Sequence, residues 1–172
     1  MALSSLRENI GRRSLARHKQ SDKSETLKLL KDVREVGLVY DVQKSSVQTL
    51  NKLTHYFEAA GSKVFTIGFV DEKELGSNNP TSKDFFFCKK DLNLWKVPKN
   101  KAVNVFTKMA FDYLINLDMV GRNEMQAIST FSNAKVRVGR HIEQFCFAHE
   151  FMVEVSSDKE EELFQEIKKY IK

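Results

Sequence analysis

Four charged residues that follow predicted strands are the side chains of this sequence best placed to form a ligand site. Asp41, Asp71 and Asp118 each come at the end of an apolar run, and Arg122 follows the last of them by four residues. In an open parallel sheet, ligands bind beyond the carboxyl ends of the strands. We therefore expect these four residues to line one crevice. Carboxylates there could gather a divalent cation, but aspartate at a strand end is also a common turn or capping residue, and we predict no metal.

The motifs that would identify a reaction are missing from the sequence. A dinucleotide fingerprint needs glycines in the first strand–helix turn, and residues 41–46 contain none. There is no P-loop, no HxxxH pair and no Gly-x-Ser-x-Gly elbow. His149 and Glu150 are adjacent on a predicted strand, so their side chains should point to opposite faces. We therefore predict no catalytic residue and no cofactor.

Positive charge is concentrated at the N-terminus. Residues 1–31 hold eight Lys/Arg and three acids, and the rest of the chain is balanced, so the formal net charge of +5 comes from this arm. The planar arginine fork binds phosphate oxygens in pairs. We predict that the arm contacts nucleic acid and that two later lysines extend the patch. The predicted contacts are Arg7, Arg12, Arg13, Arg17, Lys19, Lys89 and Lys90.

Other interpretations of the basic segments stay open. The arm can form a helix with Leu3, Leu6 and Ile10 on one side, although Gly11 weakens a helix by about 1 kcal/mol relative to alanine. Its composition also fits a solvated tail, a cleavable transit peptide or, with few apolar residues, a membrane-surface helix. A second basic region, between Lys83 and Lys108, surrounds Trp95. That tryptophan could stack on bases, but the simpler interpretation is that it covers a sheet edge among solvated lysines.

Strand–helix–strand units must position these residues. Two such units in succession favour an α/β fold with three layers and a mostly parallel sheet, Rossmann-like or flavodoxin-like. We expect a basic N-terminal helical arm over residues 1–31 and a single α/β domain over residues 32–172. Apolar periodicity predicts strands at 32–41, 63–70, 85–88, 113–117, 135–139 (near a sheet edge) and 147–155. It predicts helices at 44–60, 103–109, 122–131 and 160–171, the last capped by Asp158.

The composition also bears on location. No apolar run approaches the roughly 18–20 residues of a membrane span, and there is no signal-peptide pattern. Cys88 and Cys146 lie among phenylalanines, and only Cys88 has a basic neighbour, Lys89. These features are typical of buried, reduced thiols in a cytoplasmic protein.

Two resemblances add to this interpretation. FDYLINLD followed by ISTFSNAKVRVGR, within residues 111–140, resembles the N-terminal domain of heptosyltransferase-like glycosyltransferases. Those enzymes place their sugar-nucleotide site between two such domains, so the resemblance supports the fold and argues against the activity. GFVDEKEL, DFFFCKKDLN, FDYLINLD and FSNAKVRVGR together look like a family of small bacterial proteins of unknown function, over residues 33–155. That resemblance implies a bacterial cytoplasmic protein and supplies no catalytic residues.

The function that these observations favour is binding without catalysis. We expect the basic arm to contact structured RNA or a ribonucleoprotein, most plausibly the ribosome. One alternative is a transferase-like domain that binds a sugar phosphate or nucleotide in the crevice formed by Asp41, Asp71, Asp118 and Arg122. Another is a scaffold subunit whose partner is a second protein.

Overall fold

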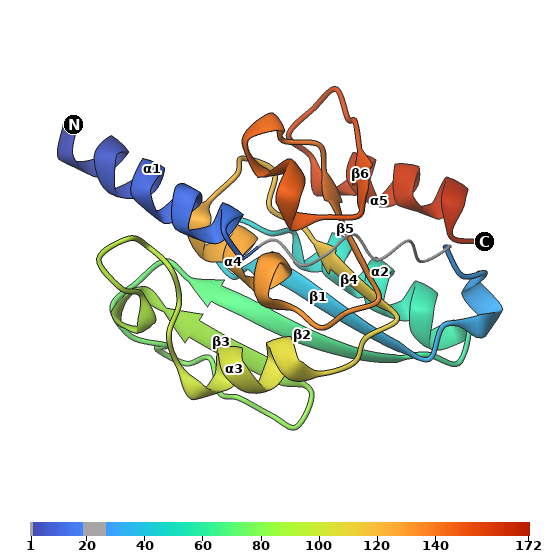
Figure 1. Ribbon diagram of the computed structural model, residues 1–172. Coiled ribbons are helices and arrows are strands. Elements are labelled where there is room, and N and C mark those ends of the chain that lie inside the picture. Colours follow the sequence, from blue (N-terminus) through green and yellow to red (C-terminus); the bar gives the residue numbers. More distant parts are fainter. Residues whose placement is uncertain (1, 19–26) are drawn as a thin grey trace.

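A six-stranded parallel sheet forms the centre of the molecule (Figure 1). The structure, a computed structural model, describes residues 2–18 and 27–172. The strands follow the order β3-β2-β1-β4-β5-β6, and every neighbouring pair is parallel. The direction of winding reverses between β1 and β4, so the predicted α/β class is confirmed and the sheet is doubly wound. The strands are β1 (Glu35–Asp41), β2 (Lys63–Val70), β3 (Asp84–Cys88), β4 (Tyr113–Asn116), β5 (Val136–Arg140) and β6 (Phe151–Val153).

Helices cover both faces of this sheet. On one face, α2 (Val47–Ala59) and α5 (Glu160–Tyr170) enclose a core that includes Leu53 and Phe164. On the other face, α3 (Lys101–Lys108) and α4 (Asn123–Phe131) enclose a second core that includes Phe106 and Ile128. Within the described ranges, the remaining helical elements are the 3₁₀ helices η1 (Leu30–Asp32), η2 (Lys89–Asp91) and η3 (Glu143–Ala148).

Helix α1 (Ala2–Ala16) lies outside the second helical layer, against α4 and η3 (Figure 1). Leu15 is fully buried there, next to Ala127 and Phe145. Gly11 allows the close approach, because a Cβ at that position would lie 2.2 Å from the carbonyl oxygen of Trp95. The helix that residues 3–10 were expected to form is present. Its docking does not use Leu6, which is 53% exposed, and the residues of α1 described as buried are Gly11 and Leu15.

Local signals explain why the first crossover forms where it was predicted. Ser46 caps α2 by accepting a hydrogen bond from the backbone N–H of Thr49. Gly61 follows the helix with a φ of +88°, a conformation that glycine adopts without steric cost. The strand–helix–strand units of residues 35–70 and 113–140 are therefore both confirmed, and they place the ends of β1 and β4 side by side.

Two predictions near the C-terminus were wrong. The strand predicted over 147–155 shrinks to β6, because the apolar residues before it form η3 and pack against α1 and α4 instead of the sheet. His149 therefore precedes the strand and is buried against Gly139. Asp158 does not cap α5. Its carboxylate accepts a hydrogen bond from Arg140, at 2.5 Å, and the N-cap position belongs to Lys159.

Candidate functional site

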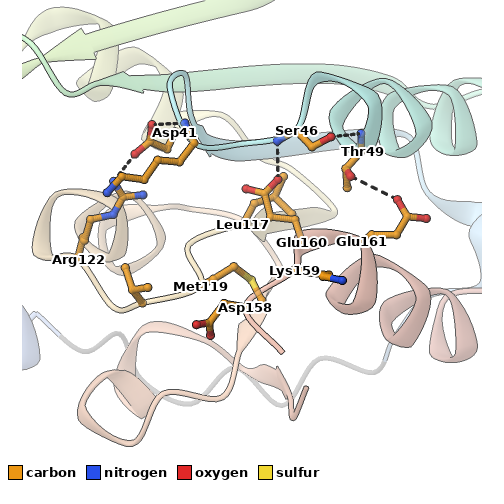
Figure 2. A pocket seen from close by; sticks show the side chains of 12 residues that line it. Asp41, Ser46, Thr49, Leu117, Met119, Arg122, Asp158, Lys159, Glu160 and Glu161 are labelled. Atoms are coloured by element: carbon orange, nitrogen blue, oxygen red, sulfur yellow. Dashed lines mark hydrogen bonds and ion pairs between the residues drawn. The ribbon is translucent and has the colours of Figure 1, made fainter. Parts of the chain in front are cut away.

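A pocket of about 440 Å³ opens where the winding of the sheet reverses (Figure 2). The ends of β1 and β4 form its floor, and the first turns of α2 and α5 form its walls. Asp41 and Arg122, two of the four predicted crevice residues, line it. This is the position at which doubly wound proteins bind ligands.

Arg122 joins the two strand ends. Its Nη1 donates to Oδ2 of Asp41, and its Nε donates to Oδ1 of Asp118 at 3.4 Å. Both carboxylates are buried. Burial opposes the charged guanidinium, but the two aspartates outweigh it and raise the pKa of Arg122. Most of the charge at this point of the crevice is thus neutralised within the protein.

The two aspartates also organise their own loops. Oδ1 of Asp41 accepts hydrogen bonds from the backbone N–H groups of Gln43 (2.8 Å) and Lys44 (2.9 Å). Oδ2 of Asp118 accepts from the backbone N–H of Arg122 (2.6 Å) and from the side-chain amide of Gln126 (2.9 Å). The turn-forming role considered for these aspartates is therefore confirmed.

Asp71, the fourth predicted crevice residue, lies apart from this network. Its carboxylate pairs with Lys89 at 2.9 Å, and it lines a neighbouring hollow instead of the pocket of Figure 2. The structure thus joins three of the four residues in one hydrogen-bond network. The fourth, Asp71, lies outside that network but lines a second hollow, of about 540 Å³, together with Arg122.

Glu160 is a residue of this pocket that the sequence analysis did not identify. Its carboxylate accepts hydrogen bonds from Oγ of Ser45 (2.5 Å) and from the backbone N–H of Ser46 (3.1 Å), as Figure 2 shows for Ser46. These groups open α2, where the pyrophosphate of a dinucleotide is held in Rossmann proteins. Burial raises the pKa of Glu160. A carboxylate therefore occupies the position of a phosphate. Asp158 and Glu161 add negative charge to the lining, which Lys44 and Lys159 partly offset.

The predicted nucleic-acid contacts on α1 divide into two groups. Arg7, Arg13 and Arg17 are exposed, and no ion pair found among the described residues involves them. Arg12 is half-buried and donates to Gln144 of η3, so it also anchors the helix. Lys19 lies outside the described residues.

The predicted extension of the patch lies close to α1. Lys89 and Lys90 are both exposed on η2. Lys89 and Arg7 line the same hollow, of about 490 Å³, together with Lys96. Lys96 is tied to the helix itself, since its ammonium lies 2.7 Å from a carboxylate oxygen of Glu8.

Trp95 lies beside α1, so the interpretation that it covers a sheet edge was wrong. Its ring is half-buried and packs on the cluster that includes Leu15 and Phe145. It also lines a groove of about 320 Å³ with three residues of α1 and with Arg17, which directly follows the helix. We call this the α1–Trp95 groove; its lining residues are Ile10, Arg13, Ser14, Arg17 and Trp95. Sequence reasoning could not place the groove, because its walls are about 80 residues apart in the chain.

The two cysteines differ in environment. Cys88 is buried, as predicted, but Cys146 is exposed. Sγ of Cys146 lies 3.6 Å from Nε2 of His141, and Nδ1 of His141 lies 3.6 Å from a carboxylate oxygen of Glu154. In the sequence, Lys89 is the only basic residue next to a cysteine. In the folded protein, Cys146 also has a basic neighbour, His141.

Two absences apply to the part of the chain that the structure describes. Within residues 2–18 and 27–172, no group of three or more His, Cys, Asp or Glu side chains is placed to hold a metal ion. None of the helices in those ranges has the length and apolar character that a membrane span requires.

The fold and the strand-end pocket define a doubly wound α/β domain of the Rossmann-like class, with an added basic helix. The chain belongs to a family of unknown function, DUF6913, whose family model matches residues 7–172. No curated protein and no solved structure matches it significantly. The matched residues include most of α1.

Proposed function

We propose that this chain is a non-catalytic RNA-binding protein that contacts phosphates with the outer face of α1. The observation that carries the proposal is the exposure of the Arg7, Arg13 and Arg17 side chains. All three are exposed, and none takes part in an ion pair found among the described residues. Exposed guanidinium groups without carboxylate partners are suited to bidentate contact with phosphate oxygens.

The attachment of α1 to the body supports the same proposal. Nδ2 of Asn123 donates to the backbone carbonyl of Glu8 at 2.8 Å, and Lys96 pairs with the Glu8 side chain. A helix that is already fixed on a folded body presents its arginines without a further ordering cost at binding. The partner we propose is structured RNA, with the ribosome as the large assembly to test, in the cytoplasm of a bacterium.

The test compares two variants with the same loss of charge. Arg7, Arg13 and Arg17 are replaced together by glutamine in one variant. In the matched control, glutamine replaces three exposed lysines that lie outside α1: Lys31, Lys63 and Lys172. Binding of a labelled structured RNA, followed by fluorescence anisotropy, should weaken strongly in the arginine variant and little in the control.

Salt dependence makes this test quantitative. Loss of three phosphate contacts should reduce the slope of log affinity against log salt by about 2 to 3, since each contact contributes about 0.7 to 0.9. In sedimentation with ribosomes, the arginine variant should likewise bind more weakly than the lysine control. Equal RNA binding by both variants would contradict the proposal.

A second candidate function is ligand binding in the pocket of Figure 2, which its place at the reversal of winding favours. The resemblance of residues 111–140 to heptosyltransferase-like enzymes suggests a sugar phosphate or nucleotide. Glu160, which occupies the phosphate position, argues against such anions and ranks this candidate second. A ligand at 100 times its dissociation constant should add about 2.7 kcal/mol of stability. Absence of any thermal shift with nucleotides and sugar phosphates would remove it.

A further inference from the structure

The α1–Trp95 groove combines an aromatic residue with two cations. Ile10, Arg13, Ser14 and Arg17 follow the i, i+3, i+4, i+7 spacing of one helix face, with Arg17 directly after the last residue of α1. Arg13 and Arg17 are one turn apart, about 6 Å along the axis. Among the residues that the structure describes, none of those lining this groove carries a carboxylate, whereas the strand-end pocket is lined by several. An anion that carries a planar ring is the ligand to which this combination is complementary.

The loop that carries Trp95 is fixed before any ligand arrives. Oδ1 of Asn93 accepts hydrogen bonds from the backbone N–H groups of Trp95 (2.8 Å) and Val97 (3.1 Å). Leu92 and Pro98 form an isolated antiparallel bridge at the base of the loop. Nδ2 of Asn123 then donates to the carbonyl of Trp95, at 3.4 Å, as well as to α1. The ring is thus held against the helix in a defined position.

From this geometry we propose that the groove binds one unpaired nucleobase, stacked on Trp95, with Arg13 and Arg17 on the phosphates that flank it. The proposal rests on the RNA-binding function above and specifies its substrate, which is single-stranded RNA at this contact. In a duplex the faces of the bases are already stacked, so only the phosphates remain available to the arginines. Stacking on an aromatic side chain tolerates any base, so little sequence preference is expected.

Trp95 is the only tryptophan of the chain, so its intrinsic fluorescence reports directly on the groove. The full chain is titrated with a single-stranded oligouridylate of about ten nucleotides, a length within the site sizes of stacking proteins, and with a duplex of equal length. Quenching at saturation is expected with the single strand and not with the duplex.

Two variants test the contact. Trp95→Leu should weaken single-strand binding about 5- to 150-fold, the range of one stacked base, and leave duplex binding unchanged, with Trp95→Phe retaining most of the affinity. Because Trp95 also packs on buried residues, Ser14→Asp serves as a second variant. It places a carboxylate in the groove without removing a core side chain, and it should also weaken single-strand binding.

The outcomes separate this inference from the function on which it rests. If labelled RNA binds equally as single strand and duplex, with no quenching and no effect of Trp95→Leu or Ser14→Asp, the groove is not a base site, while phosphate contact by α1 still stands. If no RNA binds at low salt, the RNA-binding function fails and the base site fails with it.

Discussion

His149 is a buried base with an unusual environment. Its Nε2 atom has no hydrogen-bond partner among the described residues, and its ring lies against the backbone of Gly139. Burial, with a smaller contribution from Arg137, lowers the pKa of His149 from 6.5 to about 3. The neutral imidazole is therefore the form that the fold accommodates.

This histidine should make the protein less stable as the pH falls. Between pH 6.5 and about 3 the unfolded chain binds a proton that the folded chain does not, so the free energy of unfolding should fall by about 1.4 kcal/mol per pH unit. His149→Gln should remove that contribution to the slope between pH 6.5 and about 4.5, in urea melts at several pH values. The exposed His55 supplies the control, since His55→Gln should preserve the slope. A slope unchanged in His149→Gln would contradict the assignment.

The cysteines should differ in reactivity. Burial, reinforced by a hydrogen bond to Asp91, raises the pKa of Cys88, whereas Cys146 is exposed, with its Sγ 3.6 Å from Nε2 of His141. Iodoacetamide followed by peptide mass spectrometry should therefore label Cys146 in the native protein and Cys88 only after unfolding. His141→Gln should slow the labelling of Cys146 and leave Cys88 protected. If Cys88 were labelled before Cys146 in the native protein, the assignment of Cys88 as buried and Cys146 as exposed would be wrong.

At the scale of elements, two ion pairs secure β5 to segments later in the chain. The side chain of Arg137 is 4% exposed and donates to Glu150 before β6, whereas Asp158, which pairs with Arg140, is 75% exposed. Removal of one partner of a buried pair costs about 3–5 kcal/mol, and an exposed pair contributes about 0–1 kcal/mol. Glu150→Ala should therefore reduce the free energy of unfolding several times more than Asp158→Ala in urea titrations. Comparable effects would contradict the buried role of Arg137.

The docking of α1 depends on Gly11. A larger residue there would overlap the carbonyl oxygen of Trp95 and Nδ2 of Asn123, and overpacking costs about 1–3 kcal/mol. We expect Gly11→Val to destabilise the protein by this amount and to shift the emission of Trp95 to longer wavelength as α1 moves away. Arg13→Gln on the exposed face should change stability by less than about 0.5 kcal/mol. An unchanged Gly11→Val emission spectrum would show that the contact is not close.

Local patterns predicted most of these elements. The apolar runs at 63–70 and 113–117 and the cap at Ser46 act within a few residues, so the sequence contains the whole signal. The strand prediction was wrong for the region before β6, because the apolar side chains there pack against α1. No periodicity in residues 147–155 shows which partner these side chains contact. Likewise, Gly11 weakens an isolated helix, and only the distant loop explains its presence.

At the scale of the whole molecule, the candidate sites also depend partly on local signals and partly on contacts between distant segments. The rule that strands of a parallel sheet end at one edge located Asp41, Asp118 and Arg122. It could not show that Glu160 reaches the start of α2, or that Trp95 faces α1, since both contacts join segments far apart in the chain. The basic charge was visible in composition alone, but the exposure of Arg7, Arg13 and Arg17 beside two different hollows required the docked helix.

Arg122 connects the two halves of the sheet, so its removal tests whether the strand ends form a frame or a ligand site. Arg122→Ala would leave Asp41 and Asp118 buried without their cation, which should cost about 3–5 kcal/mol at neutral pH. Urea melts near pH 7 measure this loss, and Lys52→Ala, which breaks the exposed pair with Glu161, should cost less than about 1 kcal/mol. A variant as stable as the parent would mean that Arg122 is held in place for a ligand. That result would favour the pocket of Figure 2 as the functional surface over the outer face of α1.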